Sequence, residues 1–115
     1  MNNQEREEHR LAALAAGYEF RDKYSPALYW RKIDSDTWTT WQPKINKADS
    51  FDLMVACALE LDVYSQEHIV CFTKQDSTVE GESLGLFAES YMQAIFNCAV
   101  AIGRSMEASN EQSED

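Results

Sequence analysis

The side chains best suited to chemistry in this chain are carboxylates, and many of them lie in its second half. Between residues 48 and 103 nine acidic residues stand against one base, Lys74, so this stretch carries a charge of −8. Such an excess of one sign speeds association with a partner of the opposite sign. The pattern predicts a surface that binds a basic protein partner. The predicted partner-binding residues are Glu60, Asp62, Glu67, Asp76, Glu80 and Glu82.

Aromatic and basic residues interleave earlier in the chain and offer a second kind of chemistry. All three tryptophans lie between residues 30 and 41, beside several lysines and arginines. A face of this composition can stack nucleobases and contact phosphates, which indicates single-stranded nucleic acid as an alternative partner. Its residues are Trp30, Arg31, Lys32, Trp38, Lys44 and Lys47. Twenty acidic against ten basic residues give a net charge of −10, which argues against nucleic acid.

The histidines and cysteines form no motif that indicates a catalytic, metal-binding or cofactor-binding site. His68 and Cys71 are three residues apart, so on a strand they point to opposite faces and cannot share one ion. His9 lies in a charged segment, where we expect it to be solvated. Cys57 and Cys98 lie in apolar segments, and no secretory leader precedes them, which predicts reduced core thiols in a cytoplasmic protein. We therefore expect no catalytic residue, no metal and no cofactor.

The first half of the chain predicts one helix and one hairpin. Residues 3–16 have high helix propensity, and Gly17 is suited to end the helix, whose thin apolar side predicts a peripheral position. Residues 18–20 favour a short extended piece. From residue 27 to 41, β-branched and aromatic residues flank a turn at Asp34-Ser35-Asp36, which predicts an antiparallel hairpin with Tyr29 and Arg31 on one face.

A second helix is predicted to begin at Asp49 or Ser50, either of which can cap it. Its apolar residues recur at helical spacing and predict a stripe that faces the core. The stripe consists of Phe51, Met54, Val55, Ala58 and Leu59, widened by Leu53, Cys57 and Leu61.

The remaining elements are two extended segments, a loop, a long helix and a tail. Residues 63–64 and 68–73 favour strands, residues 74–83 a polar loop, and residues from Leu84 or Leu86 to Met106 a helix. Residues 107–115 predict a disordered acidic tail after one domain at residues 1–106. The fold class is α+β, in which a small antiparallel sheet, the hairpin plus one or two further strands, packs with helices in α-β-β-α-β-α order. No apolar run is long enough to cross a bilayer.

Four short motifs resemble a known family. They are Trp41-Gln42-Pro43, Asp49-Ser50-Phe51-Asp52-Leu53, Leu59-Glu60-Leu61-Asp62-Val63 and the alanine-rich segment at residues 94–104. Over residues 28–104 the chain resembles the small phage and prophage accessory proteins grouped as phage α/β/α (ABA) sandwich domains. The resemblance implies a phage-encoded protein in the host cytoplasm and a sheet flanked by helices. It carries over no catalytic residue.

Together these patterns favour a protein that acts by binding rather than by catalysis. The first hypothesis is a non-enzymatic protein-binding accessory protein, present as a monomer or a homodimer and independent of membranes. The resemblance to phage proteins adds an alternative, an acidic DNA-mimic-type inhibitor of a host defence nuclease of the anti-CRISPR or anti-restriction type. A further alternative is a single-stranded nucleic-acid binder that uses the aromatic and basic hairpin.

Overall fold

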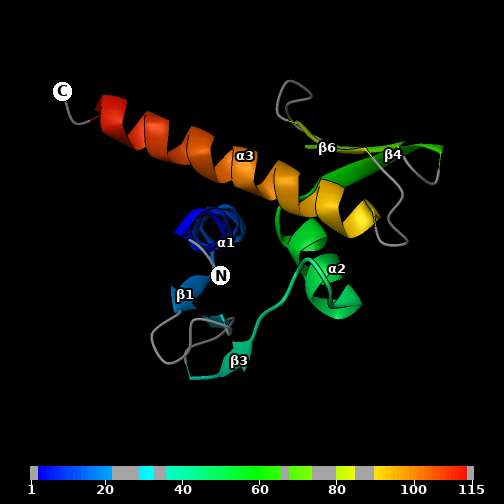
Figure 1. Ribbon diagram of the computed structural model, residues 1–115. Coiled ribbons are helices and arrows are strands. Elements are labelled where there is room, and N and C mark those ends of the chain that lie inside the picture. Colours follow the sequence, from blue (N-terminus) through cyan, green and yellow to red (C-terminus); the bar gives the residue numbers. More distant parts are fainter. Residues whose placement is uncertain are drawn as a thin grey trace.

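The protein has an α+β fold, and its described residues form two small antiparallel sheets and three helices. The computed structural model describes residues 3–21, 29–32, 36–65, 68–73, 80–84 and 90–113. In these ranges the elements follow as α1, β1, β2, β3, α2, β4, β5, β6 and α3 (Figure 1). The strand orders are β1-β2-β3 and β4-β5-β6. The predicted α+β class is confirmed, although the strands divide into two sheets where one was expected.

Helix α1 spans Asn3–Ala16, the predicted range, and Gly17 follows it with φ +77°. The predicted peripheral position is wrong, because Leu11, Ala12 and Ala13 are buried. Alanine side chains are so small that α1 can approach α3 closely, and a methyl group added at Gly103 of α3 would overlap the backbone of Leu11. A narrow apolar stripe is therefore sufficient for a central helix.

The first sheet contains β1 (Glu19–Arg21), β2 (Trp30–Lys32) and β3 (Trp38–Thr40). β2 and β3 form the predicted hairpin, with Trp30 opposite Thr40 and Lys32 opposite Trp38. Two residues of its predicted turn, Asp34 and Ser35, lie outside the described residues. Tyr29 and Arg31 are both buried, so they face the interior together as strand alternation predicts.

Helix α2 spans Lys47–Ala56, and Asn46 caps it: the Asn46 side chain accepts a hydrogen bond from the Asp49 N–H. The predicted caps, Asp49 and Ser50, instead lie in its first turn. The predicted core stripe is wrong at Phe51 and Val55, which are 59% and 61% exposed, whereas its members Leu53, Met54 and Cys57 lie in or against the core. The buried side of α2 is formed by Ser50 and Leu53, and Ala58 and Leu59 lie beyond the end of the helix. A short helix with apolar residues all round contains several equally good stripes, so periodicity alone could not choose among them.

The second sheet contains β4 (Leu59–Ser65), β5 (His68–Thr73) and β6 (Glu80–Leu84). The predicted strands at residues 63–64 and 68–73 are confirmed. The predicted polar loop at residues 74–83 differs, because β6 begins at Glu80. Gly81 explains this polar strand, since a methyl group there would overlap the backbone of Cys98 in α3. The inner face therefore leaves no room for a side chain at Gly81, and Glu80 and Glu82 on the outer face are exposed.

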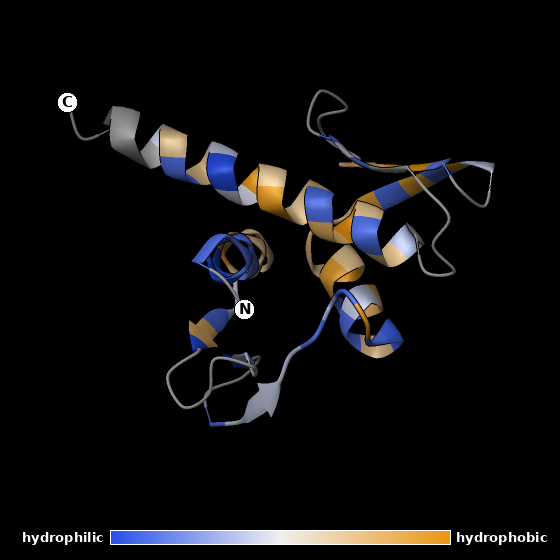
Figure 2. Ribbon diagram, viewed as in Figure 1, coloured by the Kyte–Doolittle hydropathy of each residue, from blue (hydrophilic) through white to orange (hydrophobic). Residues whose placement is uncertain are grey.

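Helix α3 spans Ser90–Ser113 and lies between the second sheet on one side and α1 and α2 on the other (Figure 1). Ile95, Phe96 and Cys98 are buried in this middle layer. Figure 2 shows that the apolar residues of α3 lie mainly in its first half, where the other elements surround it. Among the described residues, no helix is both long and apolar enough to cross a membrane.

The end of α3 differs from the predicted tail at residues 107–113, and residues 114–115 lie outside the described residues. We expected the helix to stop at Met106, but it continues to Ser113. Glu107 forms an ion pair with Arg10 of α1, with Oε2 and Nη1 2.8 Å apart. This contact, and residues such as Glu and Ala with good helix propensity, extend the helix past the apolar region.

Candidate functional site

The outer face of the second sheet brings together the predicted acidic residues. Strand register places Glu60, Phe72 and Glu80 side by side across β4, β5 and β6, and Asp62, Val70 and Glu82 in the next row. Residues opposite each other in a sheet share a face, so these six side chains point the same way. With His68, they are called the outer face below. Glu60, Asp62, Glu80 and Glu82 are all exposed.

Burial of the opposite face fixes this orientation. Leu59, Ile69 and Cys71 alternate with the outer-face residues and are buried, and the sheet packs on α3. A slip of one residue would move the apolar set into water, so the register is strongly specified.

The outer face has a defined size and composition. Neighbouring strands lie about 4.8 Å apart, so the carboxylates of β4 and β6 in one row are about 10 Å apart at the backbone, and the two rows are separated by about 6.6 Å. Val70 and Phe72 lie between them and are partly exposed. An apolar centre with a charged rim is the usual composition of a protein interface.

His68 also belongs to the outer face, which sequence reasoning missed. Its Nε2 lies 2.6 Å from Glu82 Oε1, and its ring stacks on Tyr64 with centroids 4.8 Å apart. The two-residue spacing of His68, Val70 and Phe72 was the available signal. The other two predicted partner-binding residues, Glu67 and Asp76, lie outside the described residues.

The alternative nucleic-acid face is only partly assembled. Trp30, Lys32 and Trp38 share the outward side of the first sheet, and the Lys32 Nζ lies 5.8 Å from the centre of the Trp38 ring. Arg21 joins them from β1, with its guanidinium carbon 4.1 Å from the same ring centre. The pairing of β1 with β2 brings Arg21 there, and the sequence offered no signal for that pairing beyond the extended segment itself.

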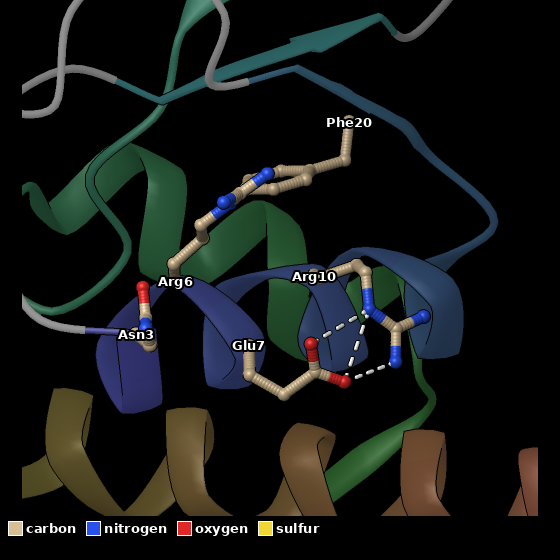
Figure 3. Close-up of a pocket in the computed structure, with 5 residues that line it drawn as sticks. All are labelled: Asn3, Arg6, Glu7, Arg10 and Phe20. Carbon is tan, nitrogen blue, oxygen red and sulfur yellow. Dashed lines mark hydrogen bonds and ion pairs between the residues drawn. The ribbon is translucent and has the colours of Figure 1, made fainter.

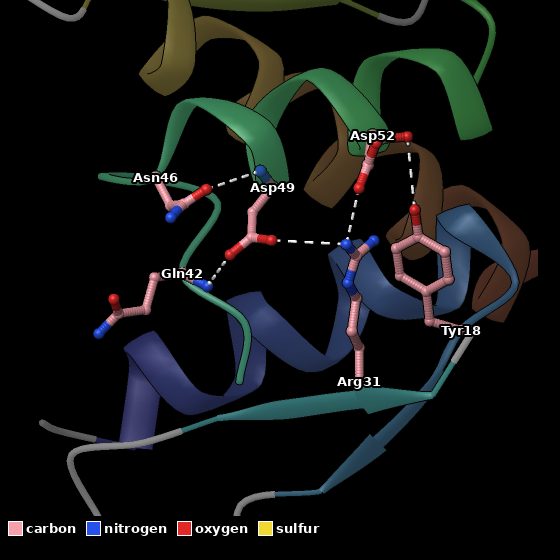
Figure 4. A network of polar contacts seen from close by, with 6 residues as sticks. All are labelled: Tyr18, Arg31, Gln42, Asn46, Asp49 and Asp52. Atoms are coloured by element: carbon pink, nitrogen blue, oxygen red, sulfur yellow. Dashed lines mark hydrogen bonds and ion pairs between the residues drawn. The ribbon is translucent and has the colours of Figure 1, made fainter. Parts of the chain in front are cut away.

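Arg31 does not belong to that face, which corrects the prediction. It is 5% exposed and points inward, where its Nη2 lies 2.7 Å from Asp52 Oδ2 and 3.4 Å from Asp49 Oδ1 (Figure 4). Asp49 also accepts a hydrogen bond of 2.9 Å from the Gln42 N–H. The Arg31 charge therefore ties β2 to the beginning of α2, and it is not available to a phosphate.

The two remaining lysines of the prediction are not part of the strands of the first sheet. Lys44 has its Nζ 5.5 Å from the centre of the Phe96 ring, and Lys47 begins α2. Lys44 instead borders a small pocket of about 170 Å³. That pocket is lined by Glu5, His9, Tyr29, Gln42, Lys44 and Ile45.

His9 is buried, although the sequence predicted a solvated side chain. Its ring stacks on Tyr29 with centroids 4.3 Å apart, and its Nδ1–H donates to the Glu5 carbonyl at 2.7 Å. Burial lowers the pKa of His9, which favours the neutral ring. The prediction failed because the sequence neighbours of His9 are charged, whereas the central position of α1 turns the His9 side chain itself inward.

A larger hollow of about 490 Å³ lies between α1 and β1 (Figure 3). Asn3, Arg6, Glu7, Arg10 and Phe20 line it, and none of them was a predicted site residue. Arg10 is bound to Glu7 and to Glu107, and the hydrogen bond from Arg10 lowers the pKa of Glu7. The carboxylates of Glu7 and Glu107 thus neutralise the Arg10 guanidinium. This pairing makes the hollow less suitable for binding an anion.

The thiols have the surroundings of core residues. Cys71 and Cys98 are buried and hydrogen-bonded to each other, and this bond together with burial raises the pKa of Cys71. Burial raises the pKa of Cys57 to about 12. Cys57 and Cys71 are therefore protonated thiols at neutral pH rather than nucleophilic thiolates. The described residues include no group of three or more potential ligands placed to hold a metal ion.

Comparisons with protein-family models, curated proteins and solved structures find no match. The resemblance to phage sandwich domains stays a prediction. Among the arrangements above, the outer face unites the largest number of predicted residues on one exposed surface, and we take it as the candidate site.

Proposed function

We propose that this protein is a non-enzymatic accessory protein that binds a basic protein through the outer face of the second sheet. The supporting observation is the placement of Glu60, Asp62, Glu80 and Glu82 on one exposed face around Val70 and Phe72. Because these side chains stand on strands packed against α3, they are held in place before binding, which lowers the entropy cost of association.

The electrostatics of the face favour a basic partner. Among the described residues, Glu60, Asp62 and Glu80 form no ion pair with a lysine or arginine, and Glu82 is paired with His68. Unneutralised carboxylates leave a negative potential that steers a basic surface toward the sheet. Together with the resemblance to phage proteins, this negative potential supports the proposal that the protein is phage-encoded and acts on a basic host protein in the host cytoplasm.

A DNA-mimic-type inhibitor of a host nuclease is the second candidate, since the same regular array of carboxylates supports it. It differs from the first candidate in the site that the partner uses, which would then be the DNA-binding groove. The single-stranded nucleic-acid binder is less well supported, because Arg31 is buried in an ion pair and Lys44 and Lys47 lie elsewhere.

Charge reversal with a matched control tests the proposal. The Glu60→Lys/Asp62→Lys variant changes the outer face, and the Glu8→Lys/Glu19→Lys variant makes the same change of net charge on α1 and β1. Tagged wild-type protein and both variants are used to capture partners from host-cell lysate at low salt, and association rates are then measured with the purified partner. We expect wild type and the control variant to capture the partner, and the outer-face variant not to capture it. At low salt, the outer-face variant should also associate most slowly with the purified partner.

Equal capture by all three proteins would contradict the proposal. Competition separates the two candidates: duplex DNA should displace the protein from a nuclease groove, and it should leave a partner bound elsewhere unaffected.

A further inference from the structure

Strand β4 forms one edge of the second sheet. It pairs with β5 along one side, and none of the described strands pairs with its other side. An unpaired edge presents a row of N–H and C=O groups, which can bind another extended chain. The strand is seven residues long, and five of its residues are exposed, including Asp62, Val63 and Tyr64.

The helix that covers the sheet leaves this edge open. α3 packs closely against β6 and β5 but touches β4 only slightly. In Figure 1 the far end of β4 extends beyond the beginning of α3. The open edge is therefore the edge of the sheet that α3 covers least.

The inner face of β4 forms an apolar ledge beside this edge. Val63 pairs with Ile69, which is 6% exposed, yet Val63 itself is 65% exposed. The cover over the sheet thus ends between these two neighbours. Leu61, on the same face, is half-buried. An apolar side chain on an added strand would remove Val63 and Leu61 from water.

The outward-facing carboxylates of β4 determine which charge a strand that pairs with this edge must carry. Glu60 and Asp62 alternate with Leu61 and Val63, so a neighbouring strand would place every second side chain beside a carboxylate. A second copy of β4 fits poorly, because antiparallel pairing about Leu61 would set Glu60 against Asp62 of the other copy. The register shift between Val63 and Ser65 further interrupts such pairing.

We propose that the β4 edge binds an extended segment of a basic protein as a fourth strand of the second sheet, with lysine or arginine alternating with apolar residues. This inference rests on the proposed function and adds the mode of binding, in which backbone hydrogen bonds supply affinity and alternate side chains supply specificity. The basic side chains meet Glu60 and Asp62, and the apolar side chains meet Leu61 and Val63.

A synthetic peptide tests the proposal on the full chain. The probe is a capped heptapeptide of alternating lysine and valine, and its control is an isomer with the four lysines in one block and the three valines in another. Two further alternating peptides carry backbone N-methyl groups, one on the lysines and one on the valines. Binding is followed by amide chemical shifts and by hydrogen exchange of residues 60–64.

Strand addition predicts a specific set of results. The alternating peptide should bind more tightly than the block isomer and slow amide exchange in β4. Only one of the two N-methylated peptides should lose binding, because successive residues of a strand direct their N–H groups to opposite sides. Glu60→Gln/Asp62→Asn should weaken binding about tenfold, since two charge pairs are lost, whereas the Glu8→Gln/Glu19→Gln control should not.

Three other results would overturn the edge proposal. If alternating and block peptides bind equally and depend on Glu60 and Asp62 without protecting β4, the acidic face binds by charge alone and the proposed function survives. If β4 amides are already protected in a dimer of the free protein, a second copy occupies the edge. If no peptide binds, the edge does not take this class of segment, and lysate capture with the charge-reversed variant still decides the proposed function independently.

Discussion

At the scale of single residues, an aromatic cluster around His9 joins α1 to the first sheet. Trp41 has no exposed surface, and Tyr18 and Phe20 approach it edge-on with ring centroids 5.9 and 6.3 Å away. His9 also approaches Trp41 edge-on and packs against Phe96 of α3. The cluster thus includes side chains from α1, the first sheet and α3, so losing one member affects several elements together.

Truncation of Trp41 should be strongly destabilising. We expect Trp41→Ala to lower the free energy of unfolding by about 3 to 5 kcal/mol, as for other large aromatic residues removed from cores. Urea unfolding measures the change, with Trp38→Ala as the control because Trp38 is partly exposed. Equal losses for the two variants would show that Trp41 contributes no more to stability than a surface tryptophan.

The buried His9 predicts a loss of stability in mild acid. Its pKa in the folded state is lowered by burial, so the unfolded chain, with an ordinary value of about 6.5, takes up the proton first. The stability linked to His9 is therefore complete above about pH 6.5 and falls as the pH drops below it toward the folded pKa. Unfolding free energies between pH 5 and 8 should show this fall in the wild type and in His68→Gln, but not in His9→Phe. If His9→Phe loses as much unfolding free energy over this pH range as the wild type, the loss is due to other titrating groups.

At the scale of elements, chain reversals mark where the helices end. Gly17 follows α1 with φ +77°, and Ala58 follows the C-cap residue of α2 with φ +54°. Glycine adopts such angles without penalty, whereas alanine meets a steric clash between its Cβ and the backbone. Ala58 nevertheless adopts this angle because β4 must begin at Leu59.

These two positions predict opposite effects of exchanging glycine and alanine. Ala58→Gly should raise the free energy of unfolding by about 0.5 to 1 kcal/mol, and Gly17→Ala should lower it by about 1 kcal/mol. No atom lies within 4 Å of the Cβ position at Gly17, so the second effect isolates the backbone angle. Thermal and urea unfolding of both variants provide the test, and a stabilising Gly17→Ala would contradict it.

At the scale of the whole molecule, close contacts along α3 hold the layers together. β6 lies on α3 at Gly81, and α1 lies on α3 at Gly103. Each contact lacks space for even one methyl group. Packing of this kind transmits a small local change to the arrangement of whole elements.

Gly103→Ala should therefore destabilise the protein although alanine is the better helix former. Inside a helix the exchange alone would add about 1 kcal/mol of stability. Here the new methyl group overlaps the Leu11 carbonyl, and such overpacking costs about 1 to 3 kcal/mol, so we expect a net loss. The control, Ser109→Ala, changes an exposed position of the same helix and should be neutral or slightly stabilising. A gain of stability in Gly103→Ala would show that α1 can move away freely.

Local features could be predicted from the sequence because their causes act within a few residues. The range of α1, the hairpin of β2 and β3, strand β5 and the shared face of Tyr29 and Arg31 follow from propensity, turn residues and alternation. The acidic character of the second half is likewise evident from composition. Strands at Glu60 and Asp62, and at Glu80 and Glu82, were not predicted, because the sequence favoured a helix stripe up to Leu61 and a polar loop at residues 74–83.

Tertiary packing decided the rest, because it depends on partners that lie far away in the sequence. Burial of His9 required α1 to be central, and the role of Arg31 required Asp49 and Asp52 of α2. The two pairs of carboxylates form one surface only because β5 lies between β4 and β6, and α3 covers the opposite side. The sequence thus determined which residues carry charge, and the strands β4 and β6, their order in the sheet and the position of α3 decided that these residues meet on one exposed face.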